Sequence, residues 1–138
     1  MLIAPKSVRL EDLQASLARH WIVESAGLDR LVIQEEGSRV YIEEDPNYTN
    51  ALEKESHPHL QRLKELISTN PNTTAYFFDY SDIELVKKAL LICANDHRII
   101  VDNDFGTILR GPEFIQKIRS NPSWDWREDA KRSDQTRG

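Results

Sequence analysis

The chain has 138 residues, of which 39% are hydrophobic and 30% charged, with a formal net charge of −5 at pH 7. This acidic balance disfavours a general nucleic-acid binder, because affinity for phosphate groups depends on clustered Lys and Arg. No apolar run approaches the ~20 residues that span a bilayer, and the run from Leu2 to Ala4 is too short for the apolar core of a signal peptide. We therefore expect a cytoplasmic protein with no membrane or direct nucleic-acid partner.

A chain of this length can form one hydrophobic core. We expect a single globular domain over residues 1–126, followed by a polar, flexible tail over residues 127–138. The only cysteine, Cys93, cannot form an internal disulfide. It lies in an apolar helical run, and free cysteines are among the most buried residues, so we predict that it packs in the core.

A first helix is predicted after Ser7, which can cap it, because Leu10, Leu13 and Leu17 recur at helical spacing until the helix ends near His20. Three short segments rich in β-branched and aromatic residues follow, at 21–25, 29–36 and 38–44. The turn at 36–38 contains glycine and indicates a hairpin. The three segments predict antiparallel strands, in which alternation separates an apolar face (Leu31 and Ile33; Val40 and Ile42) from a face open to solvent (Tyr41 and Glu43).

A second helix is predicted to begin near His57 or Pro58, with Ser56 as its cap and Asn70 and Pro71 at its end. Its apolar stripe comprises Leu60, Leu63, Leu66 and Ile67. A further helical turn is predicted around residues 50–55.

The segment from Thr74 to Tyr80 contains three consecutive aromatic residues, which is typical of a central strand covered on both faces. Residues 81–84 form a capping-box pattern, with Ser81 as the cap of a helix that ends near Asn95. On this helix we expect Lys87 and Lys88 to point to solvent. The remaining elements are a hairpin, with strands at 98–101 and 107–109, and a last helix that opens at 111–113 and ends at 121–122. Trp124 and Trp126 follow, and we expect them to pack back or lie at a surface.

These elements predict an α+β fold: a mainly antiparallel sheet built from two hairpins and a central strand, packed by three to four helices. The strand at 74–80, the helix at 81–95 and the strand at 98–102 could place one parallel pair in this sheet, with a right-handed crossover.

A metal site is one hypothesis, since Asp79, Asp82, Asp102 and Asp104 lie near predicted strand ends, where carboxylates can converge on a hard cation. Their spacing does not match the calcium-binding loop, and turn formation and helix capping explain them equally well. Four histidines (His20, His57, His59 and His97) lack the spacing of a zinc site.

The sequence contains no phosphate-binding glycine loop and no nucleophile motif, so we predict no cofactor, no resident metal and no catalytic residue. An enzyme remains an alternative, as a metal-dependent hydrolase that uses Asp79, Asp102 and Asp104. A second alternative is a structural module that self-associates through its hairpin edges.

Acidic residues are concentrated between Asp29 and Glu55. Carboxylates at the tip and far end of one hairpin can accelerate the encounter with a cationic partner, and nearby tyrosines can anchor it. Solvation of a sheet edge also accounts for this charge. The leading interpretation is a monomeric or homodimeric binding protein of the immunity or antitoxin kind, which neutralises a basic partner enzyme such as a nuclease toxin. Its predicted partner-binding residues are Glu35, Glu36, Tyr41, Glu43, Glu44, Asp45 and Tyr48.

Overall fold

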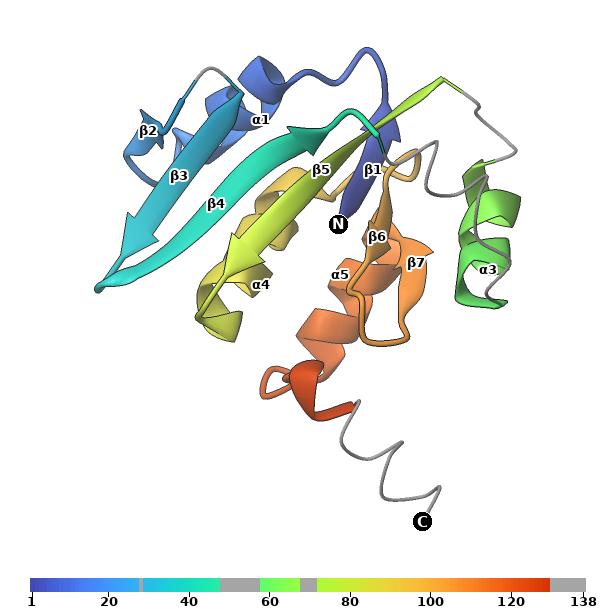
Figure 1. Ribbon diagram of the computed structural model, residues 1–138. Coiled ribbons are helices and arrows are strands. Elements are labelled where there is room, and N and C mark those ends of the chain that lie inside the picture. Colours follow the sequence, from blue (N-terminus) through green and yellow to red (C-terminus); the bar gives the residue numbers. More distant parts are fainter. Residues whose placement is uncertain (28, 48–57, 68–71, 130–138) are drawn as a thin grey trace.

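The computed structural model describes residues 1–27, 29–47, 58–67 and 72–129, which form one antiparallel sheet with helices packed against it (Figure 1). The seven strands of the sheet have the order β2-β3-β4-β5-β1-β6-β7. They are β1 (Leu2–Pro5), β2 (Val23–Ser25), β3 (Arg30–Glu35), β4 (Ser38–Asp45), β5 (Thr73–Tyr80), β6 (Ile100–Asp102) and β7 (Ile108–Arg110). The helices are α1 (Leu10–Leu17), α3 (Pro58–Ile67), α4 (Ile83–Cys93) and α5 (Gly111–Ser120). The predicted α+β fold is confirmed.

The first three-stranded unit, β2-β3-β4, forms as predicted, because a two-residue turn fixes its register. Glu35 pairs with Ser38, so that only Glu36 and Gly37 connect β3 and β4. Both connecting residues have positive φ, 48° and 82°, as the tightest hairpin turns require. This register places the buried apolar residues of β3 and β4, Leu31, Ile33, Val40 and Ile42, together on one side of the sheet.

The centre of the sheet differs from the prediction, because β1 lies between β5 and β6 and is antiparallel to both. The expected parallel pair of residues 74–80 and 98–102 is therefore wrong: β5 and β6 run in the same direction but are separated by β1. No strand was predicted at Leu2–Pro5. Four residues that end in proline show neither alternation nor a turn signal, and only pairing with distant strands makes them a strand.

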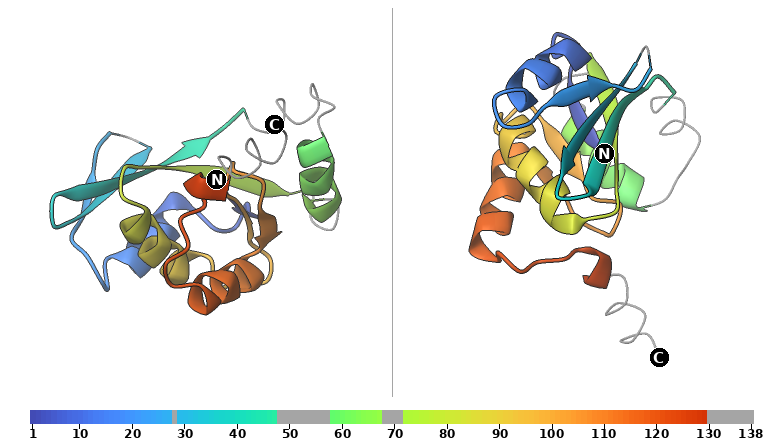
Figure 2. Two further views of the ribbon diagram at one scale, coloured as in Figure 1. Left: turned by 90° about the horizontal axis from the view of Figure 1, so that it is seen from below. Right: turned by 90° about the vertical axis from the view of Figure 1, so that its left-hand side faces the viewer.

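Three helices, α1, α4 and α5, cover one face of the sheet, which we call the helix face (Figure 2). Leu13 and Leu17 of α1 and the apolar side of α4 pack there with buried strand residues such as Ile33, Val40 and Tyr76. Cys93 belongs to the same core, as predicted. Burial raises the pKa of its thiol to about 12, because the thiolate would lose its hydration.

The opposite face is covered by α3 over one part only. Leu63, which is fully buried, packs with Ile3, Ala75, Ile100 and Ile108, which come from β1, β5, β6 and β7. The predicted apolar stripe of this helix is confirmed at Leu63, Leu66 and Ile67. The α3 helix thus covers β1 and its neighbours, and none of the described helices lies over β2, β3 and β4 on this face (Figure 1).

Helix caps lie away from the predicted serines. The α1 helix begins after Arg9 rather than Ser7, and the backbone N–H of Arg9 donates to Asp12 Oδ2 over 2.8 Å. The α4 helix is capped by Asp82 rather than Ser81, and Asp82 Oδ1 accepts from the backbone N–H of Glu84 over 2.9 Å. At α4 the carboxylate of the cap residue itself accepts from the first turn, whereas at α1 the Asp12 carboxylate accepts from the backbone N–H of the cap residue; neither helix uses the predicted serine as its cap.

The prediction that Lys87 points to solvent is wrong, since its side chain is only 4% exposed. Its ammonium donates to the backbone oxygens of Pro122 (2.7 Å) and Trp124 (3.0 Å) and to Glu84 Oε1 (3.2 Å). This contact fixes the segment after α5 against α4. In the same segment, Trp126 is 1% exposed, and its Nε1 donates to the hydroxyl of Tyr80 over 2.6 Å.

The predicted hairpin of β6 and β7 and the opening of α5 at residues 111–113 are confirmed. The predicted cap Ser56, the helical turn at 50–55 and the helix end at Asn70 and Pro71 lie outside the described residues. Within the described segments, no helix is long and apolar enough to cross a membrane.

Candidate functional site

The face opposite α1, α4 and α5, over β2, β3, β4 and the second half of β5, is not covered by any described helix. We call it the open face. Successive residues of a strand point to opposite sides of the sheet. The strand residues that alternate with the buried helix-face residues therefore have their side chains on the open face. The open face consists of Glu24, Arg30, Val32, Gln34, Arg39, Tyr41, Glu43, Asp45, Phe77 and Asp79, with Ile22 just before β2.

At the centre of the open face, Arg30 lies over the ring of Tyr41, with its guanidinium carbon 4.2 Å from the ring centre. Arg30 is also 3.9 Å from the carboxylates of Glu43 and Asp79. These distances are too long for hydrogen bonds, and the buried Nε of Arg30 has no hydrogen-bond partner. Arg30 therefore offsets part of the negative charge of the two carboxylates and stacks on the tyrosine ring.

Two large apolar side chains are exposed on the open face. Ile22 is 84% exposed and Phe77 is 45% exposed. Phe77 follows Tyr76 in the stretch that was predicted to be covered on both faces. That prediction holds for the half of β5 that pairs with β1 but is wrong for Phe77. The first residue of β1, Leu2, pairs with Tyr76, so β1 does not reach Phe77, and the core under α3 does not extend to it.

A hollow of ≈540 Å³ lies at the outer end of the open face, over β2, β3 and β4. It is lined by Ile22, Glu24, Ser25, Ala26, Val32, Gln34, Glu36, Arg39 and Tyr41. We call it the β2–β4 hollow. Its lining combines apolar carbon, two carboxylates and one guanidinium, a composition suited to a polar side chain with an apolar stem.

The structure divides the predicted partner-binding residues between two faces. Tyr41, Glu43 and Asp45 lie together on the open face. Glu36 lies at the turn beside them, where it lines the β2–β4 hollow. Glu35 and Glu44 point to the helix-face side, and Tyr48 lies outside the described residues.

Glu35 is engaged within the protein. Its carboxylate accepts from Trp21 Nε1 over 2.7 Å and from the ammonium of Lys88. The hydrogen bond from Lys88, and then the one from Trp21, hold the pKa of Glu35 below its ordinary value. Glu35 therefore joins the start of β2 to α4 rather than presenting a free charge.

Sequence reasoning did not select Ile22, Glu24, Arg30, Val32 or Phe77. The sequence does contain a signal for Glu24, Arg30 and Val32. In the two-residue period of their strands each alternates with residues of the apolar face, which predicts that its side chain lies on the opposite face. Ile22 and Phe77 carry no such signal, since an apolar residue in a strand region is ordinarily expected in the core.

The acidic residues of the metal hypothesis do not gather at one point. Asp102 and Asp104 line one hollow, of ≈210 Å³, whereas Asp79 lines another. Asp102 Oδ1 accepts from the N–H of Asp104 over 2.9 Å, which is a turn contact, and Asp82 caps α4. Among the described residues, no three His, Cys, Asp or Glu side chains are grouped so that they could hold a metal ion.

The histidines also lie apart. His20 lies beside Trp21, with ring centres 5.8 Å apart, and the side chain of His97 is 86% exposed. His57 lies outside the described residues, and the side chain of His59 is not described.

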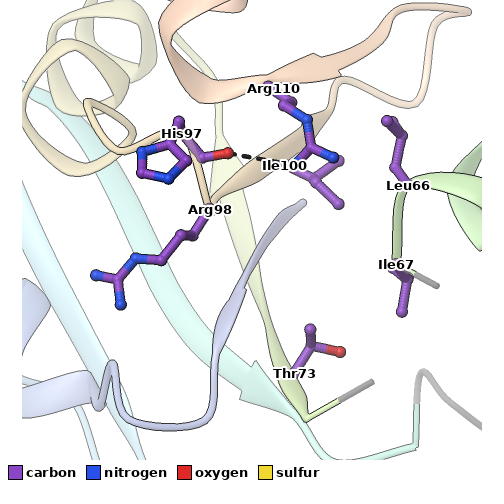
Figure 3. A pocket seen from close by; sticks show the side chains of 7 residues that line it. All are labelled: Leu66, Ile67, Thr73, His97, Arg98, Ile100 and Arg110. Atoms are coloured by element: carbon purple, nitrogen blue, oxygen red, sulfur yellow. Dashed lines mark hydrogen bonds between the residues drawn. The ribbon is translucent and has the colours of Figure 1, made fainter. Parts of the chain in front are cut away.

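A further hollow, of ≈350 Å³, lies between α3 and the β6–β7 hairpin (Figure 3). Two arginines line it. Arg98 binds the carboxylate of Asp96, with its Nη2 2.7 Å from Oδ2, and Arg110 donates to the backbone oxygen of His97 over 3.2 Å. The two side chains extend in different directions in Figure 3, so their charges do not converge on one ligand position.

Comparisons with protein-family models, with curated proteins and with solved structures found no match.

Proposed function

We propose that this chain is a small binding protein whose open face binds and neutralises a basic partner enzyme, in the manner of an immunity protein or antitoxin against a nuclease toxin. The observation that carries the proposal is the half of one sheet face over which the described residues place no helix (Figure 1). There, the exposed apolar side chains of Ile22 and Phe77 and the partly exposed ring of Tyr41 lie among charged side chains. Exposed apolar area surrounded by polar residues is typical of protein-binding surfaces.

The charge of the open face supports a cationic partner. Its acidic residues, Glu24, Glu43, Asp45 and Asp79, outnumber its arginines, Arg30 and Arg39. The whole chain is acidic in the same sense, with a net charge of −5. An acidic surface accelerates association with a basic protein and discriminates against acidic ones.

Site-specific cross-linking tests the location of this surface. A photoreactive phenylalanine analogue at Phe77 should capture a basic protein in the source cell. The same analogue at Gln116, which is exposed on α5 beneath the other face, should not. Equal capture from both positions, or capture of an acidic protein from Phe77, would overturn the proposal. Cross-linking of two copies of this chain through Phe77 would instead identify the open face as a self-association surface.

A charge-reversal pair tests how the surface works. Glu43 and Glu44 are exposed neighbours on β4 that point to opposite faces. Glu43→Lys and Glu44→Lys change the net charge of the chain equally, so they alter the long-range field to the same extent. We expect Glu43→Lys to slow association with the captured protein several-fold more than Glu44→Lys, with the difference shrinking at high salt. Equal rates would exclude the open face as the interface.

The neutralising role has its own test. The captured protein should stop growth when expressed alone, and co-expression of this chain should restore growth. Phe77→Arg, which places a cation and removes apolar area on the open face, should abolish the rescue. Rescue that persists with this variant would contradict the proposal.

A further inference from the structure

The charges on the open face are not equally compensated. Glu43 and Asp79 both lie 3.9 Å from Arg30. In contrast, no hydrogen bond or ion pair joins the carboxylate of Glu24 to any side chain or backbone group of the described segments. Glu24 is exposed on β2, at the edge of the sheet and on the wall of the β2–β4 hollow. One negative charge of the open face that no described cation offsets therefore lies at this hollow.

Apolar carbon lies beside this charge. Glu24 pairs with Val32 across the strands, which places their side chains next to each other on the open face. Ile22, which is 84% exposed, lies two residues before Glu24 and therefore about 6.6 Å along the strand direction. This separation is comparable to the length of a four-carbon lysine stem.

The opposite wall is already occupied by internal contacts. Arg39 donates from Nε to Gln34 Oε1 over 3.3 Å and from Nη1 to the Tyr41 hydroxyl over 3.4 Å. A second carboxylate, Glu36, lines the hollow near the hairpin turn. An anionic ligand would meet two carboxylates, and a purely apolar one would remove water from Glu24 without compensation.

We propose that the β2–β4 hollow binds a lysine or arginine side chain of a basic protein partner. The stem of that side chain packs on Val32 and Ile22, and its cation pairs with Glu24. Lysine and arginine side chains bind in this way because the stem is apolar while the charged end stays near water. This inference rests on the proposed function, and it identifies the anchor point on the open face.

The test uses small probes rather than the partner. Backbone amide NMR shifts of the full chain are recorded during titration with Nα-acetyl-lysine N-methylamide. The matched control is Nα-acetyl-norleucine N-methylamide, which has the same stem and no charge. The lysine probe should produce saturable shifts at the amides of Glu24, Val32 and Gln34, and the norleucine probe should bind more weakly there.

Two variants localise the effect. Glu24→Gln removes the charge that the proposal requires, and binding of the lysine probe should weaken roughly two- to fivefold, the effect of one exposed ion pair. Glu113→Gln removes an equally exposed charge from α5 and should leave binding unchanged. Equal binding of the two probes, shifts spread over the whole acidic surface, or no effect of Glu24→Gln would overturn the inference.

This result is separable from the proposed function. If Phe77 captures a basic protein and Glu24→Gln leaves lysine-probe binding unchanged, the open face is an interface whose anchor is not the β2–β4 hollow. If the lysine probe binds the hollow and Phe77 captures nothing basic, the hollow is a cation site and the proposed partner is wrong.

Discussion

Replacing Lys87 with methionine should destabilise the protein, although methionine is also unbranched and only one heavy atom shorter. The ammonium of Lys87 donates to three oxygens, and two of them are backbone carbonyls of the segment after α5, at Pro122 and Trp124. A buried carbonyl that loses its donor costs about 1–3 kcal/mol. Pro122 is exposed, so water can reach its carbonyl, and removal of a buried charge recovers some desolvation energy. We expect Lys87→Met to lower the free energy of unfolding by about 2 kcal/mol.

Urea unfolding followed by tryptophan fluorescence measures this loss directly, because Trp124 and Trp126 lie in the segment that Lys87 holds. In Lys87→Met the emission of these tryptophans should also shift to the red under native conditions, as the segment separates from α4. Lys88→Met is the matched control: Lys88 is the next residue, and its side chain is 53% exposed. Equal midpoints for the two variants would refute the assignment of Lys87 as the residue that joins α4 to this segment.

Three further predictions concern the core. Gly111→Ala should lower the free energy of unfolding by about 3 kcal/mol, measured by thermal unfolding, because the added Cβ would lie 1.9 Å from the backbone oxygen of Ala94. Cys93 should react with a disulfide reagent at pH 8 only as fast as the chain unfolds, since burial raises the pKa of its thiol to about 12; rapid labelling of the native protein would contradict its burial. Burial also raises the pKa of Tyr76 from 10.0 to about 12, and its hydroxyl donates to the backbone oxygen of Val8. The unfolded chain then loses this proton first, so stability should fall as pH rises from about 10 to 12, and Tyr76→Phe should remove that part of the fall in pH-dependent urea unfolding.

Part of the candidate site could be predicted from the sequence. The two-residue period of β4 places Tyr41 and Glu43 on the face opposite Val40 and Ile42, and the structure confirms this arrangement. The same period places Glu43 and Glu44 on opposite faces. Grouping the acidic residues into one predicted binding surface does not take this alternation into account. The exposure of Phe77 could not be predicted, because it depends on which residues of β5 are covered by β1 and α3.

The buried polar contacts also could not be predicted from short sequence patterns. Lys87 and Lys88 are adjacent and alike in sequence, but Lys87 lies under a returning segment and Lys88 lies at the surface beside Glu35. The difference comes from residues more than thirty positions away. A pattern that considers only nearby residues cannot distinguish the two lysines.

The sequence by itself determined the local elements: the hairpin around Gly37, the helix over Ile83–Cys93 and the start of the last helix at Gly111. Each follows from turn chemistry, capping or apolar period within a few residues. The tertiary structure alone decided that Leu2–Pro5 is an inner strand and that the described helices leave one half of a sheet face uncovered. Strand pairing joins residues about seventy positions apart, such as Leu2 and Tyr76. Its energy depends on the complete packing of the chain, and the open face is the part of the sheet that this packing leaves uncovered.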